Sequence, residues 1–142
     1  MARPKVFEEI YTMEIKSKKV TVQKEAAALC AFLSDVKNFE QLMPENISKF
    51  EVIRDDAFVF ALKGMPDIAL EVKEVVSPNK VVLGAISDKI PFQLEGVISE
   101  LTNDTSEAEL IFTGDFNPMM AMMVKGPITK FLETLVQNMS TL

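Results

Sequence analysis

Residues 117–142, NPMMAMMVKGPITKFLETLVQNMSTL, form the longest periodic stretch of the sequence. Apolar side chains recur in it every three or four residues, which places them along one side of an α-helix. They are Val124, Ile128, Phe131, Leu132, Leu135, Val136, Met139 and Leu142. Asn117 can cap the amino end, and Pro118 suits the first helical position. The stretch predicts one extended C-terminal helix, and the preceding chain is predicted to form the surface on which this helix lies.

Two features divide this helix. Gly126-Pro127 lies inside it, and an interior proline costs about 3 kcal/mol through a lost hydrogen bond and a clash. We therefore expect a kink or break there, with the stronger helix starting near Pro127. The methionine segment, residues 119–123, comes just before it. Because methionine is flexible and polarizable, this segment is suited to core packing or to an apolar hinge, and equally to a deformable wall of a ligand cavity.

Upstream of the helix, segments with strand character are separated by turn sequences. They are Ile10–Val22, Ile47–Arg54, Ala57–Leu62, Ile68–Val76, Lys80–Ile86, Phe92–Leu101 and Ser106–Phe116. The first segment is expected to be irregular near Ser17. Two short helices are expected after it, over Gln23–Leu33 and Lys37–Met43, and the second stops before Pro44. Hairpin-length links between the later segments favour antiparallel pairing.

These elements predict an α+β fold in a single domain spanning residues 1–142. Its sheet is seven-stranded, antiparallel and curved, with two short helices after the first strand and the long C-terminal helix over the concave face. A chain of 142 residues is long enough to bury one core. Because sheets twist and one helix touches only part of a curved sheet, we expect a hollow between them, where a small molecule can bind.

The composition limits the partners and the location. A net charge of −6 opposes binding to nucleic acid and to anionic membrane surfaces. No apolar run approaches the roughly 18 residues of a membrane span, so no integral membrane association is expected. The amino terminus lacks a secretory signal, and Cys30 is the only cysteine, which excludes an internal disulfide. We expect a cytoplasmic protein, and the oligomeric state is left open.

The sequence contains few residues suited to catalysis. The chain has no histidine, which removes histidine-based triads, metal sites and general bases. No metal-ligand spacing is recognisable, and no cofactor, metal or catalytic residue is predicted. An enzyme would need Asp, Glu, Lys or Tyr with a pKa shifted by desolvation. Arg54 suits a polar contact at a cavity rim, although the adjacent Asp55 favours a surface ion pair.

The order of elements and one local motif carry a family resemblance. Together with residues 32–44, FLSDVKNFEQLMP, this order resembles the START-like superfamily (SRPBCC) with the helix-grip fold, which includes polyketide cyclase/dehydrase proteins, lipid-transport proteins and plant pollen allergens. The resemblance covers nearly the whole chain and includes the Gly126-Pro127 pair. It implies a cavity between sheet and terminal helix that holds lipids, polyketides or steroids. Some members are enzymes, others attach to protein partners, and no catalytic motif is common to all.

A ligand cavity in this place would be lined by inward-facing strand residues and by the terminal helix. The candidates are Phe58, Phe60, Leu70, Leu94, Phe112, Phe116, Met120, Met123, Val124, Ile128 and Phe131. Each could equally be ordinary core. The main hypothesis is a non-enzymatic protein that binds a small hydrophobic ligand such as a lipid, a fatty acyl chain or a polyketide. The alternatives are a cyclase/dehydratase-type enzyme and a protein-interaction module whose cavity is filled by its own side chains.

Overall fold

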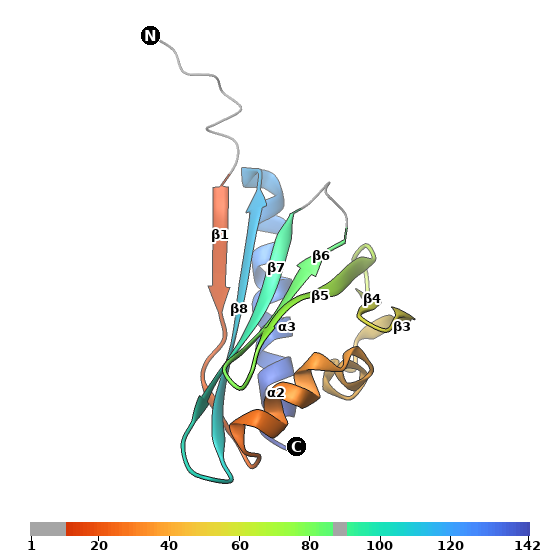
Figure 1. Ribbon diagram of the computed structural model, residues 1–142. Coiled ribbons are helices and arrows are strands. Elements are labelled where there is room, and N and C mark those ends of the chain that lie inside the picture. The colour runs from red at the N-terminus through yellow and green to blue at the C-terminus, as the bar shows by residue number, and fades with distance from the viewer. Residues whose placement is uncertain (1–10, 87–90) are drawn as a thin grey trace.

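The computed structural model describes residues 11–86 and 91–142 (Figure 1). The elements in chain order are β1 Tyr11–Lys16, β2 Val20–Val22, α2 Ala26–Ser34, the 3₁₀ helix η1 Val36–Leu42, β3 Ile47–Arg54, β4 Ala57–Leu62, β5 Ile68–Val76, β6 Lys80–Ala85, β7 Phe92–Glu100, β8 Ser106–Phe116 and α3 Pro118–Met139. The α+β element order expected from the sequence is confirmed. Ile10, the predicted start of the first strand, lies outside the described residues.

The strands form one antiparallel sheet in the order β1-β8-β7-β6-β5-β4-β3, with β2 also paired to β8. The sheet has eight strands rather than the predicted seven because the first segment divides in two. Ser17 lies at the division, where its amide donates to the Leu110 carbonyl at 2.8 Å and its Oγ accepts from the Leu110 amide at 2.9 Å. The side chain thus takes over backbone pairing where the chain bends, which is the irregularity expected near Ser17.

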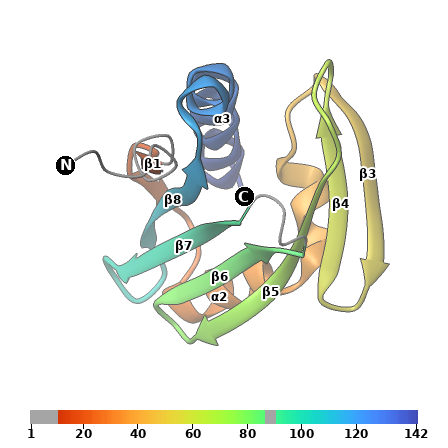
Figure 2. The same cartoon turned by 90° about the horizontal axis from the view of Figure 1, so that it is seen from above.

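The sheet curves around α3, which lies on its concave side (Figure 2). Along β8, every second residue from Ser106 to Phe116 is buried, and these residues face α3 and α2. Helix α2 adds Leu29, Cys30 and Leu33 to the same core, near the end of the sheet where α3 finishes (Figure 1). The concave face therefore carries one continuous apolar layer, called here the interior layer.

Helix α3 begins as the sequence predicts. Asn117 Oδ1 accepts from the Met120 amide at 2.8 Å, and Pro118 occupies the first turn. The helix then continues through Gly126 and Pro127, where the sequence predicts a kink or break, and the expectation of a break is wrong. This turn is exposed, so water can satisfy the carbonyl that Pro127 leaves without an amide partner.

Burial changes sharply along α3 even though the helix does not break. Its buried residues all follow Pro127: Ile128, Phe131, Leu132, Leu135, Val136 and Met139. In the methionine segment, Met119, Met122 and Met123 are 72%, 83% and 66% exposed. The helix thus has a packed C-terminal part and an N-terminal part that lies largely in solvent.

The packed part of α3 is also held by hydrogen bonds to other elements. Glu133 Oε1 accepts from the Lys18 amide at 3.2 Å, and Asn138 Nδ2 donates to the Leu42 carbonyl at 2.8 Å. Within residues 11–86 and 91–142, the part before Pro127 makes no hydrogen bond to another element beyond its own cap. The two halves of α3 are therefore anchored very differently.

Candidate functional site

The interior layer is filled by side chains. Among the described residues, voids of about 10 and about 20 Å³ lie between the sheet and the helices. A space of roughly 10–15 Å³ holds a single water molecule. The larger void is lined by Phe60, Ile68, Leu70, Phe92, Leu94, Phe112, Ile128, Phe131 and Leu132. In this conformation neither void has room for a hydrophobic ligand.

Aromatic rings occupy much of this space. Phe39, Phe58, Phe60 and Phe131 stack in sequence, with centroid distances of 5.2, 6.0 and 4.9 Å. A second series joins Phe92 to Phe112 at 5.5 Å and Phe112 to Phe116 at 6.1 Å. Stacked aromatic pairs at these distances are worth about 0.5–1.5 kcal/mol beyond their buried area. The rings fill the hollow that the curvature of the sheet would otherwise leave.

The residues expected to line a cavity fall into three groups. The larger void brings together Phe60, Leu70, Leu94, Phe112, Ile128 and Phe131. Phe58 and Phe116 are buried in the same core, and Met120 and Val124 are partly buried against it. Met123 is mostly exposed and lines neither void; it lies before the packed part of α3 begins. The strand residues and the packed part of the helix thus meet, whereas the methionine segment stays at the edge.

A groove of about 640 Å³ opens beside this layer, a volume typical of small-molecule pockets. It lies between α3 and the edge of the sheet where β3 starts and β4 ends. Figure 2 shows α3 facing β4 across the concave space on this side. Its lining residues are Pro44, Glu45, Asn46, Leu62, Lys63, Met65, Gly126, Pro127, Lys130, Phe131 and Thr134. Of these, Phe131 alone is among the site residues predicted from the sequence.

Local backbone chemistry shapes the groove. Pro44 follows the end of η1 and starts one wall, and Gly64, with a φ of 84°, makes the tight turn between Lys63 and Met65 on another. The Lys63 amide donates to the Asn46 carbonyl at 2.9 Å and ties these two walls together. The sequence could not place the groove because its walls come from three separate segments, residues 44–46, 62–65 and 126–134.

Phe131 belongs to both spaces. It is the residue shared by the lining of the groove and the lining of the larger void. Phe131 is 5% exposed, and its ring stacks on Phe60 with an interplanar angle of 9°. Phe131 therefore lies between the groove and the apolar interior.

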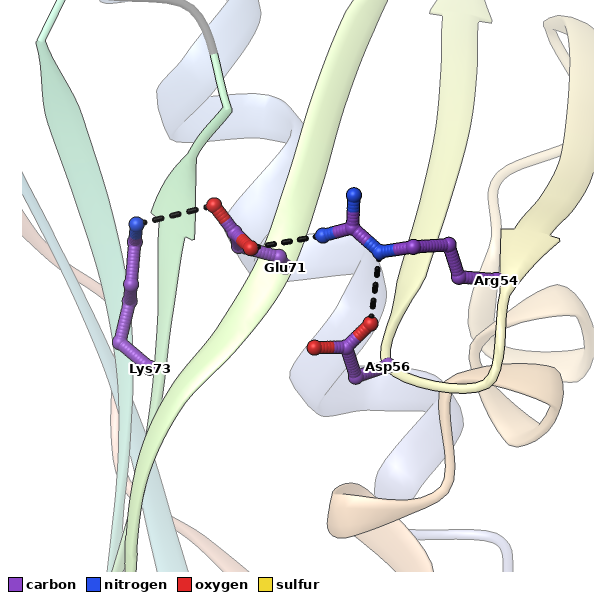
Figure 3. A network of polar contacts seen from close by, with 4 residues as sticks. All are labelled: Arg54, Asp56, Glu71 and Lys73. Atoms are coloured by element: carbon purple, nitrogen blue, oxygen red, sulfur yellow. Dashed lines mark hydrogen bonds and ion pairs between the residues drawn. The ribbon is translucent and has the colours of Figure 1, made fainter.

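Arg54 lies elsewhere, on the outer face of the sheet (Figure 3). Its Nε donates to Asp56 at 2.9 Å and its Nη2 donates to Glu71 at 2.7 Å, while Lys73 Nζ donates to the other Glu71 oxygen at 2.9 Å. The Asp56 hydrogen bond raises the pKa of Arg54. The hydrogen bond from Arg54 lowers the pKa of Asp56, and the hydrogen bond from Lys73 is the largest cause of the lowered pKa of Glu71. Arg54 is thus paired on the surface, with Asp56 and Glu71 rather than with Asp55.

The interior layer, as far as the described residues show it, contains no Asp, Glu, Lys or Arg side chain. The buried polar residues there are Ser17 and Ser106, and Cys30 is a buried free thiol. Across residues 11–86 and 91–142, no three His, Cys, Asp or Glu side chains gather as a metal site would require. In the same part of the chain, no helix combines the length and the apolar character needed to cross a membrane. The arrangement offers an apolar surface and a polar groove mouth.

Comparison with known proteins identifies the fold. No family model and no curated protein matches the sequence. Solved structures do match: a START superfamily protein from Mycobacterium smegmatis has a TM-score of 0.68 at 16% identity, over 94% of this chain and 95% of its own. Truncated norcoclaurine synthase from Thalictrum flavum has a TM-score of 0.74 at 14% identity, over 94% of each chain. The same enzyme in complex with dopamine and hydroxybenzaldehyde has a TM-score of 0.74 at 14% identity, over 99% of this chain and 92% of its own.

The chain therefore has the START-like helix-grip fold. Identities of 14–16% over nearly the full length establish this fold and no more. The resemblance seen in residues 32–44 and in the element order is confirmed at this level.

Proposed function

We propose that the protein binds a small hydrophobic ligand, such as a lipid, a fatty acyl chain or a polyketide, between the sheet and α3. The ligand enters through the groove. The observation that carries this proposal is the position of Phe131, a single ring between a groove of about 640 Å³ and an interior lined only by apolar side chains. Norcoclaurine synthase has the same fold and a structure in complex with two small aromatic molecules, which supports a small-molecule site here.

Binding requires the interior to open, and the anchoring of α3 indicates how. The packed part is held by Glu133 and Asn138, whereas the part before Pro127 is mostly exposed. Outward movement of the N-terminal part, or rotation of Phe131, joins the groove to the larger void. The methionine segment can then pack on the ligand, because thioether side chains adapt to irregular apolar shapes. Each ligand methylene that is buried contributes about 0.8 kcal/mol toward the cost of opening.

A matched pair of threonine variants tests this route. Thr134 lines the groove and Thr129 does not, yet both lie on α3 and both hydroxyls donate to the carbonyl four residues back, at 3.0 and 2.7 Å. Binding is measured with N-phenyl-1-naphthylamine, an uncharged probe that fluoresces in apolar surroundings. Native mass spectrometry of gently purified protein reports any ligand that co-purifies.

We expect saturable probe binding to the wild-type protein. Thr134→Phe, which fills part of the groove, should weaken it about tenfold, equivalent to about 1.4 kcal/mol. Thr129→Phe should leave it unchanged. Absence of saturable binding by the wild type, or equal affinities in the two variants, would contradict the proposal.

A second candidate function is a protein-interaction module, and two observations favour it. The interior is filled in this conformation, and Met119, Met122 and Met123 expose apolar surface on one helix. Exposed apolar patches are common at protein interfaces. The two candidates predict different results in the probe experiment, since a module with a permanently filled interior admits no probe past Phe131.

A further inference from the structure

The charges at the groove differ from those of the whole chain. Lys63 and Lys130 lie on opposite walls, one at the end of β4 and the other on α3, and Glu45 is the single acidic residue of the lining. Two lysines against one glutamate leave the groove with an excess positive charge, whereas the chain carries −6. Among the described residues, neither lysine forms an ion pair, although lysines 16, 49, 73 and 80 do. The groove mouth is thus a local cationic site on an acidic protein.

The floor between these lysines is apolar. Leu62 and Phe131 are buried at the base of the groove, and Met65 is partly buried beside them. Beyond Phe131, the larger void is lined by apolar residues alone. Polarity therefore changes along one direction, from the two ammonium groups at the mouth to a wholly apolar interior.

We propose that the protein selects a single-chain fatty carboxylate, with the carboxylate held between Lys63 and Lys130 and the alkyl chain directed past Phe131. This inference rests on the proposed function and names its ligand class. The orientation follows from desolvation, because a carboxylate in the interior layer would lose its hydration without gaining a partner there. An uncharged chain of the same length fits the same apolar path but leaves the two lysines without a counter-ion.

Displacement of N-phenyl-1-naphthylamine tests this choice with three ligands of equal chain length, all below their aggregation concentrations. They are dodecanoate, dodecanol and dodecyltrimethylammonium. Because exposed ion pairs are individually weak, we expect dodecanoate to bind about tenfold more tightly than dodecanol at low salt, equivalent to about 1.4 kcal/mol. Dodecyltrimethylammonium should bind more weakly than dodecanol. The preference for dodecanoate should shrink as salt screens the two lysines.

The readout in variants is the ratio of dodecanoate affinity to dodecanol affinity. Lys63→Gln with Lys130→Gln should bring this ratio to about one, since the charge-assisted contacts are lost. Lys18→Gln with Lys19→Gln changes the net charge equally at exposed positions outside the groove, and should keep the ratio of the wild type.

The outcomes separate this inference from the function on which it rests. If the probe binds saturably but dodecanoate and dodecanol displace it equally, the selection of a carboxylate is wrong and hydrophobic binding stands. The same conclusion follows if the preference survives in the Lys63/Lys130 double variant, or if the Lys18/Lys19 pair abolishes it. Failure of the probe to bind the wild type at all overturns both proposals together.

Discussion

Replacing Phe131 with alanine removes the ring that separates the groove from the interior. Phe131 is 5% exposed and stacks on Phe60 at 4.9 Å, so its loss removes both buried area and an aromatic contact. Buried Phe→Ala changes cost about 3–5 kcal/mol. We expect the low end, about 3 kcal/mol, because Phe131 also lines the groove and water can enter the space that the ring leaves.

This cost translates into a measurable shift in thermal unfolding. An unfolding entropy of about 2.1 cal/mol/K per residue gives roughly 0.3 kcal/mol/K for 142 residues, so Tm should fall by about 10 °C. A domain with the usual stability of about 5–15 kcal/mol stays folded after such a loss. Circular dichroism against temperature measures the change.

The ligand experiment distinguishes a dividing ring from ordinary core. With the ring absent, N-phenyl-1-naphthylamine no longer has to displace it on the way from the groove to the interior, and stopped-flow fluorescence should show association about tenfold faster, equivalent to about 1.4 kcal/mol of barrier. Leu132→Ala is the control, since Leu132 is 1% exposed and lines the larger void but not the groove. It should destabilise the protein by about 2–5 kcal/mol without a comparable gain in rate. Equal acceleration in both variants, or none in Phe131→Ala, would refute the role of Phe131 as the dividing wall.

Three further predictions concern stability. Ser106→Ala should raise Tm by roughly 3 °C, because the Ser106 Oγ is fully buried and has no hydrogen-bond partner among the described residues. Ser17→Ala should instead cost about 1–3 kcal/mol, because it leaves the buried Leu110 amide unpaired. A Tm that moves in the same direction in both variants would contradict this pair of predictions. The pKa of Glu71 is lowered in the folded protein, so the ionised carboxylate stabilises the fold above its ordinary pKa of 4.5, and this stabilisation is lost as pH falls through the folded-state pKa. Glu71→Gln should therefore flatten the acid side of a plot of Tm against pH. An unchanged slope would contradict this prediction. Gly114→Ala should destabilise by about 1–3 kcal/mol in chemical denaturation, since its Cβ would lie 2.7 Å from the Phe116 ring; a neutral result would show that this ring moves freely.

The sequence predicted the elements well because their signals are local. Alternation and turn residues set the limits of β3, β4, β5 and β8, which match the structure residue for residue. The caps and periodicity of α3 were equally direct. The first strand divides because Ser17 replaces backbone pairing with its side chain, which alternation alone cannot reveal.

The candidate site could be predicted from the sequence only in part. Inward-facing residues such as Phe60 and Phe112 follow from strand alternation, but whether they enclose a ligand depends on how their rings fill the hollow. The groove depends on Pro44, Lys63 and Gly126, which no periodicity connects. Met123 shows the same limit, because helical spacing cannot tell a lining residue from a solvent-facing one where the helix extends past the sheet. The single-domain organisation, the cytoplasmic location and the ligand class stay predictions.

The uneven anchoring of α3 has a consequence for how the protein can change over time. The turns before Pro127 can unravel as a local unit, at a free energy well below that of global unfolding, because few buried contacts are lost. Their amides should therefore exchange with deuterium sooner than those after Ile128, which share the protection of the sheet. Substitutions in residues 118–126 can therefore change the rate of ligand entry. They leave the cooperative core, and with it the ability to fold, unchanged.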